Sequence, residues 1–356
     1  MAKLINNTNN FYELFEDKHF IKAKFEARKS IVYPGINANV LKLIAKKNYN
    51  PKSITAQLIK SFINSQTYIK SAEFLYTKLA DSYSKEKLIE LVCYRLLTPS
   101  HFKLSIENDD YLSVHRNVEK CIIDKDVYKI DFNNWNLSLF KLNSIGYNIN
   151  IIYYLMGVTT TFGIEQYKYK PQNISVNKND VVLDCGGCWG DTALYFSSIA
   201  DNVKVYSFEF IHENIKLFEK NLTLNKGCDI TIVQQPLWED SNTYFKIVNN
   251  GPASTISIDN SKDSIQSICI DDFVKNADLQ KIDYIKMDIE GAEEKALKGA
   301  IETIIKYKPT LAISVYHKDD DFEKLTKLID DLDLGYKFYL DYYTAIGMEI
   351  VLFCRC

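Results

Sequence analysis

The sequence of 356 residues lacks a long apolar run, a large net charge and a signal-like start. Its longest apolar stretch, residues 149–158, is interrupted by Asn150 and is too short to cross a bilayer. The net charge of −3 gives no reason to expect nucleic acid or an anionic membrane as a partner. The first residues lack the apolar segment of a secretion signal. We therefore expect a cytoplasmic protein with no nucleic-acid or membrane partner.

A regular cysteine framework is also missing. The eight cysteines follow no disulfide spacing, and several lie inside apolar runs, which is typical of buried free thiols in a reducing compartment. Cys185 and Cys188 form a C-x-x-C pair, a spacing found in redox and zinc sites. No second pair lies nearby in the sequence, and both residues belong to a glycine-rich turn. We therefore expect no metal or redox role for this pair.

The most informative segment that is present covers residues 181–192. An apolar run ends at Asp184, a glycine-rich turn comes next, and a helical pattern begins at Asp191. This order predicts the first strand, turn and helix of a nucleotide-type α/β fold. The glycines let the backbone turn sharply and approach a ligand. A glycine turn that binds no ligand is the alternative.

The residues around this turn favour one class of ligand. A dehydrogenase loop reads G-x-G-x-x-G and holds a pyrophosphate against helix amides. Here Cys185 replaces the first glycine, and Asp184 and Asp191 stand on either side. Two carboxylates suit a cationic or zwitterionic ligand better than a diphosphate, and S-adenosylmethionine meets that requirement. We expect this cofactor, with a NAD-dependent enzyme as the less favoured alternative.

A second predicted strand, residues 203–208, is followed by Glu209, about 20 residues after the turn. A carboxylate at that position accepts hydrogen bonds from the ribose hydroxyls of an adenosine ligand. The alternative is a solvated glutamate at a strand end. The residues that we expect to bind the cofactor are Asp184, Gly186, Gly187, Gly190, Asp191, Thr192, Glu209 and Asp288.

Three further polar residues come after two later strands. Asp288 ends the predicted strand 284–288, Glu290 lies in the turn after it, and His317 lies just beyond the predicted strand 310–315. Ligands of open α/β sheets bind at the carboxyl ends of the strands, so all three should face one crevice. The alternatives are a helix cap for Asp288 and a packing or surface role for His317. We expect His317, Asp288 and Glu290 to be catalytic.

The two parts of the chain differ in pattern. Residues 1–160 read as a helical segment, clearest over residues 53–97, followed by a small β-rich part. The strand-like pieces of that part are residues 102–106, 118–123 and 127–132. We expect this region to serve the substrate side, an interaction or oligomerisation, with a homodimer as one option.

Residues 161–356 alternate strands with helices, which implies a mostly parallel sheet with right-handed crossovers. A predicted hairpin, residues 336–343 and 348–354, closes the chain at the far edge of the sheet. An insertion at residues 244–273 is placed to shape a substrate pocket. The other predicted elements are a strand at residues 230–234 and helices at 192–200, 212–225 and 293–307.

These motifs together resemble the FkbM family of S-adenosylmethionine-dependent O-methyltransferases. The matching segments, in order, are the glycine loop with Gly-Asp-Thr, the Phe-Glu strand end, the Ile-Lys-Met-Asp-Ile-Glu-Gly-Ala-Glu block and Ile-Ser-Val-Tyr-His. The resemblance covers residues 162–356 and includes Glu165-Gln166-Tyr167, a segment that in the family leads into the cofactor site. It departs from the family at Gly187-Cys188, where members usually carry Ala-Asn.

The resemblance implies a Rossmann-like class I methyltransferase domain over residues 161–356, with a seven-stranded mixed sheet that has one antiparallel strand. A weaker likeness of the N-terminal region to bacterial members tied to polysaccharide biosynthesis suggests the acceptor. That acceptor is a sugar hydroxyl, on a nucleotide-activated or a capsule or lipopolysaccharide precursor sugar. A small non-sugar alcohol or a phosphate compound is the alternative. Residues that offer sugars a ring face or an amide are Tyr244, Asn249, Asn250, Tyr342 and Tyr343.

Methyl transfer to oxygen is an in-line displacement at a sulfonium carbon, so the enzyme must mainly position its two substrates. A neutral imidazole at His317 would take the proton of the acceptor hydroxyl. Asp288 or Glu290 would orient that imidazole or hold the acceptor. In an alternative mechanism the three side chains bind Mg²⁺ or Mn²⁺, which acidifies the hydroxyl. We expect no resident metal, although a divalent cation remains an option.

Overall fold

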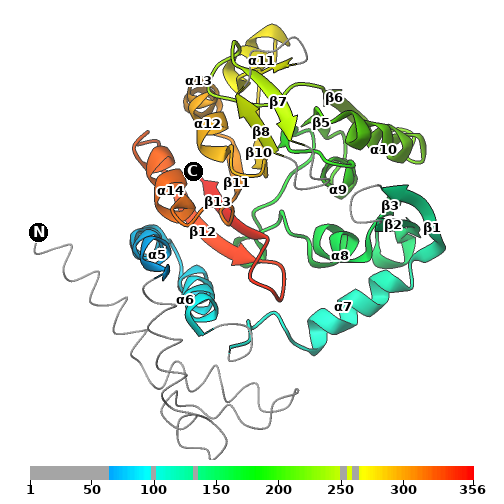
Figure 1. Ribbon diagram of the computed structural model, residues 1–356, viewed down its shortest axis with the longest axis horizontal. Helices are drawn as coiled ribbons and strands as arrows, with labels where there is room; N and C mark the ends of the chain where they lie inside the picture. The colour runs from blue at the N-terminus through cyan, green and yellow to red at the C-terminus, as the bar shows by residue number, and fades with distance from the viewer. Residues whose placement is uncertain (1–63, 98–101, 131–134, 249–254, 259–263) are drawn as a thin grey trace, which may run out of the picture.

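A mixed seven-stranded sheet forms the centre of the protein (Figure 1). The computed structural model describes residues 64–97, 102–130, 135–248, 255–258 and 264–356. The strand order is β12-β13-β11-β10-β4-β5-β6, and β13 alone runs opposite to the other strands. This confirms the predicted fold class and the terminal hairpin. The strands are β4 (Val181–Cys185), β5 (Lys204–Phe208), β6 (Asp229–Val233), β10 (Tyr284–Met287), β11 (Thr310–Ser314), β12 (Lys337–Tyr342) and β13 (Ile350–Arg355).

Alternating side chains of these strands pack into two cores, one on each face of the sheet. Val182 and Val205 join the core with α9 (Asp191–Ile199) and α10 (His212–Thr223), whereas Leu183 joins the opposite core. Successive side chains of a strand point to opposite faces, so a strand covered on both sides must be apolar along its length. The helices of the opposite core are α11 (Ile270–Asn276), α12 (Glu293–Lys298), α13 (Ile301–Tyr307) and α14 (Asp321–Asp330).

The helix predicted at residues 293–307 is wrong in one respect, because it is divided into α12 and α13. The carboxylate of Asp271 accepts hydrogen bonds from the backbone amides of Glu302 and Thr303 and so caps α13. Gly299 allows a close approach to Trp238, whose carbonyl oxygen would lie 2.4 Å from an added Cβ. Both contacts come from distant segments, so the local helical pattern does not reveal them.

The helical pattern of the N-terminal region is confirmed where the structure describes it. Helices α5 (Gln66–Lys78) and α6 (Ser82–Leu97) lie beside α14 and β12 (Figure 1). Their buried side chains, such as Leu75 and Leu88, join the same core as α11–α14. The part of the predicted segment before residue 64 lies outside the described residues.

The three strands predicted over residues 102–132 are partly wrong. Residues 102–106 form irregular chain and a turn, and helix α7 (Asp109–Glu119) covers the start of the strand predicted at 118–123. The Asn108 side chain accepts a hydrogen bond from the Tyr111 amide at 2.9 Å, which caps α7. Asparagine favours turns and helix caps alike, so the Asn-Asp pair indicates a turn and a cap equally well. The last predicted strand lies within β1 up to residue 130, and its end falls outside the described residues.

Two small antiparallel sheets flank the main sheet. One joins β1 (Ile122–Ile130), β2 (Trp135–Lys141) and β3 (Asn150–Tyr153), and the other, in the predicted insertion, joins β7 (Tyr244–Val248), β8 (Thr255–Ile258) and β9 (Ile265–Gln266). The short helical elements are η2 (Leu142–Ile145), α8 (Leu155–Val158), η3 (Thr159–Ile164) and η4 (Lys170–Gln172). The predicted boundary between residues 160 and 161 falls inside η3. Among the described helices, none is both long and apolar enough to cross a membrane.

Candidate active site

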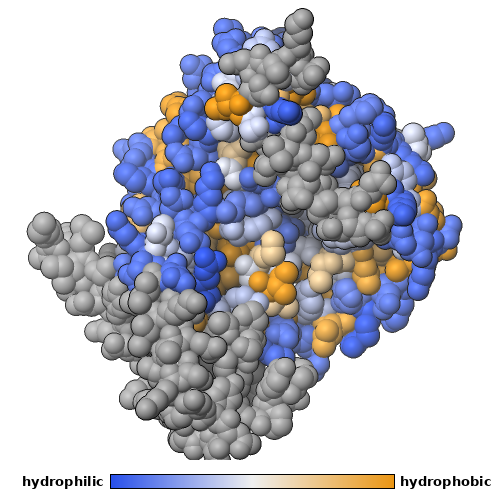
Figure 2. Space-filling view, viewed as in Figure 1, coloured by the Kyte–Doolittle hydropathy of each residue, from blue (hydrophilic) through white to orange (hydrophobic). Residues whose placement is uncertain are grey.

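A cavity of about 520 Å³ lies at the carboxyl ends of β4, β5 and β10. This is the edge at which ligands of open α/β sheets bind, and the volume is in the range of small-molecule sites. Its wall is completed by residues 153–167 and by the loop between β12 and β13. Figure 2 shows apolar side chains gathered in the middle of one face, within a mostly hydrophilic surface. The exposed apolar residues of the lining are Met156, Ile346 and Met348.

The glycine-rich turn fits tightly between neighbouring elements. Gly186 has φ +91°, and an added Cβ would lie 1.9 Å from the carbonyl oxygen of Asp288. Gly190 has φ +89°, and an added Cβ would lie 2.3 Å from the ring of Phe218. An added Cβ at Gly187 would lie 2.1 Å from the Ser207 hydroxyl. Only Gly186 of the three lines the cavity, so packing alone explains Gly187 and Gly190.

Asp184 lies beneath the turn and is fully buried. Its carboxylate accepts hydrogen bonds from the hydroxyls of Thr192 and Ser207, and it lies 3.2 Å from the Lys286 ammonium. Lys286 also donates a hydrogen bond of 2.6 Å to the carbonyl oxygen of Gly186. Asp184 is therefore placed to hold the turn, while Lys286 and Thr192 reach the cavity lining.

Asp191 opens α9 at the floor of the cavity and is 5% exposed. The Thr161 hydroxyl donates a hydrogen bond to it at 2.7 Å. Burial raises the pKa of Asp191, and the hydrogen bond from Thr161 opposes that rise. Cys188 lines the same wall with a positive φ of 44°, whereas Cys185 is buried within β4.

Glu209 faces the cavity from the end of β5 and is locked in place by its own segment. One carboxylate oxygen accepts hydrogen bonds from the amides of Phe210 and Ile211 at 2.7 and 2.8 Å. The other accepts one from Asn214 at 3.0 Å, and Asn214 is itself held by the Trp189 ring N–H. Burial raises the pKa of Glu209 to about 7, despite these hydrogen bonds.

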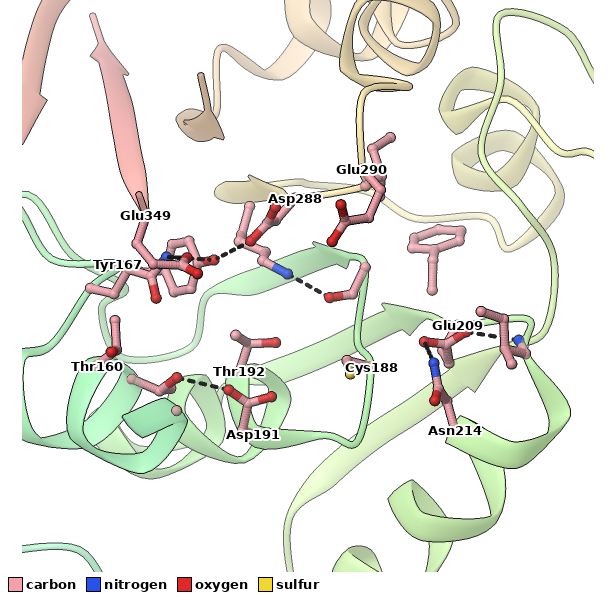
Figure 3. A pocket seen from close by; sticks show the side chains of 18 of the residues that line it. Thr160, Tyr167, Cys188, Asp191, Thr192, Glu209, Asn214, Asp288, Glu290 and Glu349 are labelled. Carbon is pink, nitrogen blue, oxygen red and sulfur yellow. Dashed lines mark hydrogen bonds between the residues drawn. The ribbon is translucent and has the colours of Figure 1, made fainter. Parts of the chain in front are cut away.

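Asp288, Glu290 and Glu349 form a second group of carboxylates in the lining, apart from Glu209 (Figure 3). Tyr167 donates a hydrogen bond to Asp288 at 3.2 Å, and Gln166 donates one to Glu349 at 2.6 Å. Burial and the charge of Asp288 raise the pKa of Glu290 to about 7. The same two causes raise the pKa of Glu349 to about 7. The Tyr316 hydroxyl lies 3.4 Å from both Asp288 and Glu349.

His317 lies behind this group and is not part of the cavity lining. Its Nδ1 is 3.0 Å from Glu293, and its Nε2 is 3.5 Å from Asp288 and 3.6 Å from Glu290. Burial lowers the pKa of His317, but the hydrogen bond with Glu293 and the surrounding carboxylates outweigh it and raise the pKa to about 9. The ring is then protonated at neutral pH. The neutral imidazole assumed for a base at His317 is not what this environment favours.

The structure thus brings Glu209, Asp191, Asp288 and Glu290 to one cavity and leaves Asp184 and His317 behind its wall. Sequence reasoning missed several lining residues, because they come from segments far apart in the chain. They are Tyr153, Tyr154, Thr160, Thr161, Asn214, Trp238, Lys286, Tyr316 and Glu349. The Glu165-Gln166-Tyr167 segment was the one available signal for this wall, and its second and third residues line the cavity.

The insertion and the aromatic residues expected to face a sugar are placed differently. No described residue of 244–273 lines the cavity. Tyr342 and Tyr343 are buried, and their hydroxyls donate hydrogen bonds to Glu90 and to the Lys168 carbonyl oxygen. Tyr244 is 40% exposed on β7, and residues 249 and 250 lie outside the described ranges. The aromatic wall is made instead of Trp135, Tyr153, Tyr154, Tyr167, Phe208, Phe210, Trp238 and Tyr316.

A comparison with one solved structure agrees with this fold. A solved FkbM methyltransferase from Methylobacillus flagellatus KT matches 80% of this chain with 20% identity and a TM-score of 0.50. The match spans 58% of that protein's length. Fibrillarin from Aeropyrum pernix, solved with natively bound S-adenosyl-L-methionine, matches 52% of this chain and 69% of its own, with 10% identity and a TM-score of 0.36. No curated protein matches the sequence.

The family comparison is more specific. The model of the methyltransferase FkbM domain matches residues 184–338, which lie inside the predicted domain of residues 161–356. The matched range begins at Asp184 and includes the glycine turn, Glu209, Asp288, Glu290 and His317. Residues 184–338 of this chain are therefore a methyltransferase domain of the FkbM family.

Proposed function

We propose that this protein is an S-adenosylmethionine-dependent O-methyltransferase that binds its cofactor in the described cavity. The observation that carries the proposal is Glu209, a carboxylate aimed into the cavity from the end of β5 and held by two amides and Asn214. Oε1 already accepts two hydrogen bonds, but Oε2 accepts only the one from Asn214 and has a lone pair left for a ribose hydroxyl. The ribose would bind there, and the methyl group would point toward Asp288.

The charge of the cavity supports the same cofactor. Its lining has five carboxylates, from Asp191, Glu209, Asp288, Glu290 and Glu349. The lining cation Lys286 is already paired with Asp184. A sulfonium and an ammonium group are attracted to such a lining, whereas a pyrophosphate is repelled. A NAD-dependent enzyme is correspondingly disfavoured.

For the acceptor we propose a sugar hydroxyl on a capsule or lipopolysaccharide precursor. Support comes from the aromatic wall, since rings such as Trp135 and Tyr154 offer stacking faces without requiring a charge. The excess of carboxylates favours an uncharged sugar inside the cavity. A nucleotide-activated acceptor would have to keep its diphosphate outside the carboxylate-rich part. A small non-sugar alcohol is the alternative, and a phosphate compound fits this lining less well.

The roles near the methyl group depend on position. Asp288 and Glu290 line the cavity and can hold the acceptor hydroxyl or take its proton. His317 contacts the acceptor only through them, since it lies behind the lining. The protein supplies orientation of two substrates for an in-line displacement, which is the main requirement for an already activated methyl donor.

Calorimetric titration with S-adenosylmethionine tests the cofactor proposal. Glu209→Ala should bind at least tenfold more weakly, because hydrogen bonds to a charged group contribute about 1.5–3 kcal/mol. The exposed Glu219 of α10 provides the matched control, and Glu219→Ala should bind like the wild type. Equal affinity of Glu209→Ala and wild type, or binding of NAD in place of S-adenosylmethionine, would contradict the proposal. A screen of neutral sugars and nucleotide sugars for methyl transfer tests the acceptor.

A further inference from the structure

The surroundings of His317 are unusual for a histidine that only packs in the core. The side chain is 10% exposed, and neither ring nitrogen has a hydrogen-bond partner of good geometry among the residues that the structure describes. Asp288 Oδ1 lies 3.5 Å from Nε2, and Glu290 Oε2 lies 3.6 Å from it. Charge-assisted hydrogen bonds between nitrogen and carboxylate oxygen are about 2.7–2.9 Å long, so neither contact is a good one.

These separations are compatible with atoms that share an ion. Ligands about 2.1 Å from a divalent cation lie roughly 3.0 Å apart when adjacent and roughly 4.2 Å apart when opposite. Both contacts of Nε2 fall between these limits. Asp288 and His317 also belong to a set of ligand atoms that all lie within 4.8 Å of one another, although the third member of that set is Glu293 and not Glu290.

The other ring nitrogen lies close to a carboxylate, the group that usually orients a metal-binding histidine. Nδ1 lies 3.0 Å from Oε1 of Glu293, whose side chain is 1% exposed. That oxygen also accepts a hydrogen bond from the Ile289 amide at 2.9 Å, so the carboxylate is fixed in position. A carboxylate at one nitrogen sets the tautomer and aims the other nitrogen at the ion. Here Nε2 is the nitrogen aimed at Asp288 and Glu290.

We propose that Asp288, Glu290 and His317 bind a divalent cation of the Mn²⁺ type, with Glu293 as the positioning residue of His317. One imidazole and two carboxylates are a donor set that Mn²⁺ accepts well, since it binds oxygen and nitrogen ligands. Asp288 and Glu290 line the cavity with side chains 18% and 33% exposed, so the ion is reached from the cavity. Its remaining positions face the solvent side and take water or a hydroxyl.

The cation site rests on this geometry alone, but its chemical role rests on the proposed function. An acceptor hydroxyl bound to the ion would lose its proton more readily, to water or to the lining carboxylate of Glu349. Its oxygen would then take the methyl group from the sulfonium, and S-adenosylhomocysteine would leave. The sequence pattern favours His317 as a base over a cation site. The position of His317 behind the two lining carboxylates reverses that preference.

Binding of Mn²⁺ to the full chain, followed by electron paramagnetic resonance without cofactor or acceptor, tests the site. The wild type should bind one ion per chain and show spin-echo modulation from a directly bound nitrogen. His317→Ala should lose that nitrogen signal and bind at least tenfold more weakly. Glu293→Gln should bind about 10–100-fold more weakly, the usual effect of an outer-shell partner. Glu294→Gln, at the more exposed neighbour of Glu293 on α12, should match the wild type.

Each outcome decides the proposal, provided that circular dichroism shows the variants folded. A missing nitrogen signal in the wild type, or equal Mn²⁺ affinity of wild type and His317→Ala, would overturn the cation site. Should Glu293→Gln fail to fold, Glu290→Gln replaces it and should also bind Mn²⁺ more weakly. Titration of the same samples with S-adenosylmethionine distinguishes a failure of the cation site from a failure of the proposed cofactor binding. A chain that binds the cofactor but not Mn²⁺ retains the proposed function and loses only this site.

Discussion

The two ends of the cavity differ in how their carboxylates are satisfied. Glu209 has its donors within one short segment, since Phe210, Ile211 and Asn214 all come soon after it in the chain. Asp288 and Glu290 come from the turn after β10 and Glu349 from the residue before β13, and their donors Tyr167, Gln166 and Tyr316 come from distant segments. The Glu209 end is therefore organised before any ligand binds. The other end has negative charge that a substrate cation or a metal ion would balance.

The largest expected effect is a loss of turnover on changing Asp288, at the end of the cavity away from Glu209. Asp288→Asn should lower turnover about 10²–10⁴-fold, the contribution of a positioned acid–base or ligand group, because the acceptor loses its charged partner. Cofactor affinity should change much less, since the ribose binds at Glu209. Steady-state assays with an acceptor from the sugar screen, paired with calorimetry, measure both. A loss of affinity as large as the loss of turnover would mean that the two ends do not act separately.

The cavity floor lies beneath both ends, and the stability of the fold should fall most when a charge is removed there. Asp184→Asn leaves the Lys286 ammonium buried without its carboxylate and should lower the free energy of unfolding by about 3–5 kcal/mol. Asp201→Asn serves as the control, because its pair with Lys178 is exposed and should contribute about 0–1 kcal/mol. Urea denaturation compares the two. Similar midpoints for both variants would show that the buried pair does not support the floor.

The glycine turn connects the two ends, because Gly186 lies against the carbonyl oxygen of Asp288. Gly186→Ala combines strain at a positive φ with a clash, and the clash alone should cost about 1–3 kcal/mol of unfolding free energy. Gly227→Ala isolates the strain, since its φ is +97° and an added Cβ meets nothing within 4 Å. The difference between these variants in urea denaturation measures the clash. No difference would mean that the turn has room for a side chain.

The smallest expected effect is a dependence of cofactor affinity on pH, which arises at the Glu209 end of the cavity. Its pKa of about 7 lies above the unfolded value of 4.5, so the folded chain holds an extra proton between these values and its stability falls as pH rises through that window. Ribose hydroxyls donate to the ionised form, so cofactor affinity should rise up to about tenfold from pH 6 to pH 8. Calorimetry across that range should show a larger rise in the wild type than in Glu209→Gln, in which Glu290 and Glu349 still ionise. A flat profile in the wild type would contradict the ribose contact.

The same contrast explains how much could be predicted from the sequence. The strands of the main sheet and the position of Glu209 depend on short apolar runs and on the polar residue at the end of each run, and these local patterns predict them correctly. Glu349 and Lys286 depend on the sheet bringing distant segments together, and no local pattern marks them. His317 lies at the predicted strand end, but its charge depends on Glu293 and the other carboxylates around it. The strands predicted on either side of Asn108 are partly wrong, because asparagine suits a turn and a helix cap equally well and here caps α7.

A crystal structure of the full chain with S-adenosylhomocysteine tests the central claim most directly. We expect the ribose hydroxyls within hydrogen-bond distance of Glu209 and the sulfur facing Asp288 and Glu290 across the cavity. Binding at another surface, or in this cavity with Glu209 free of the ribose, would contradict the assignment of the cofactor end on which the proposed function rests.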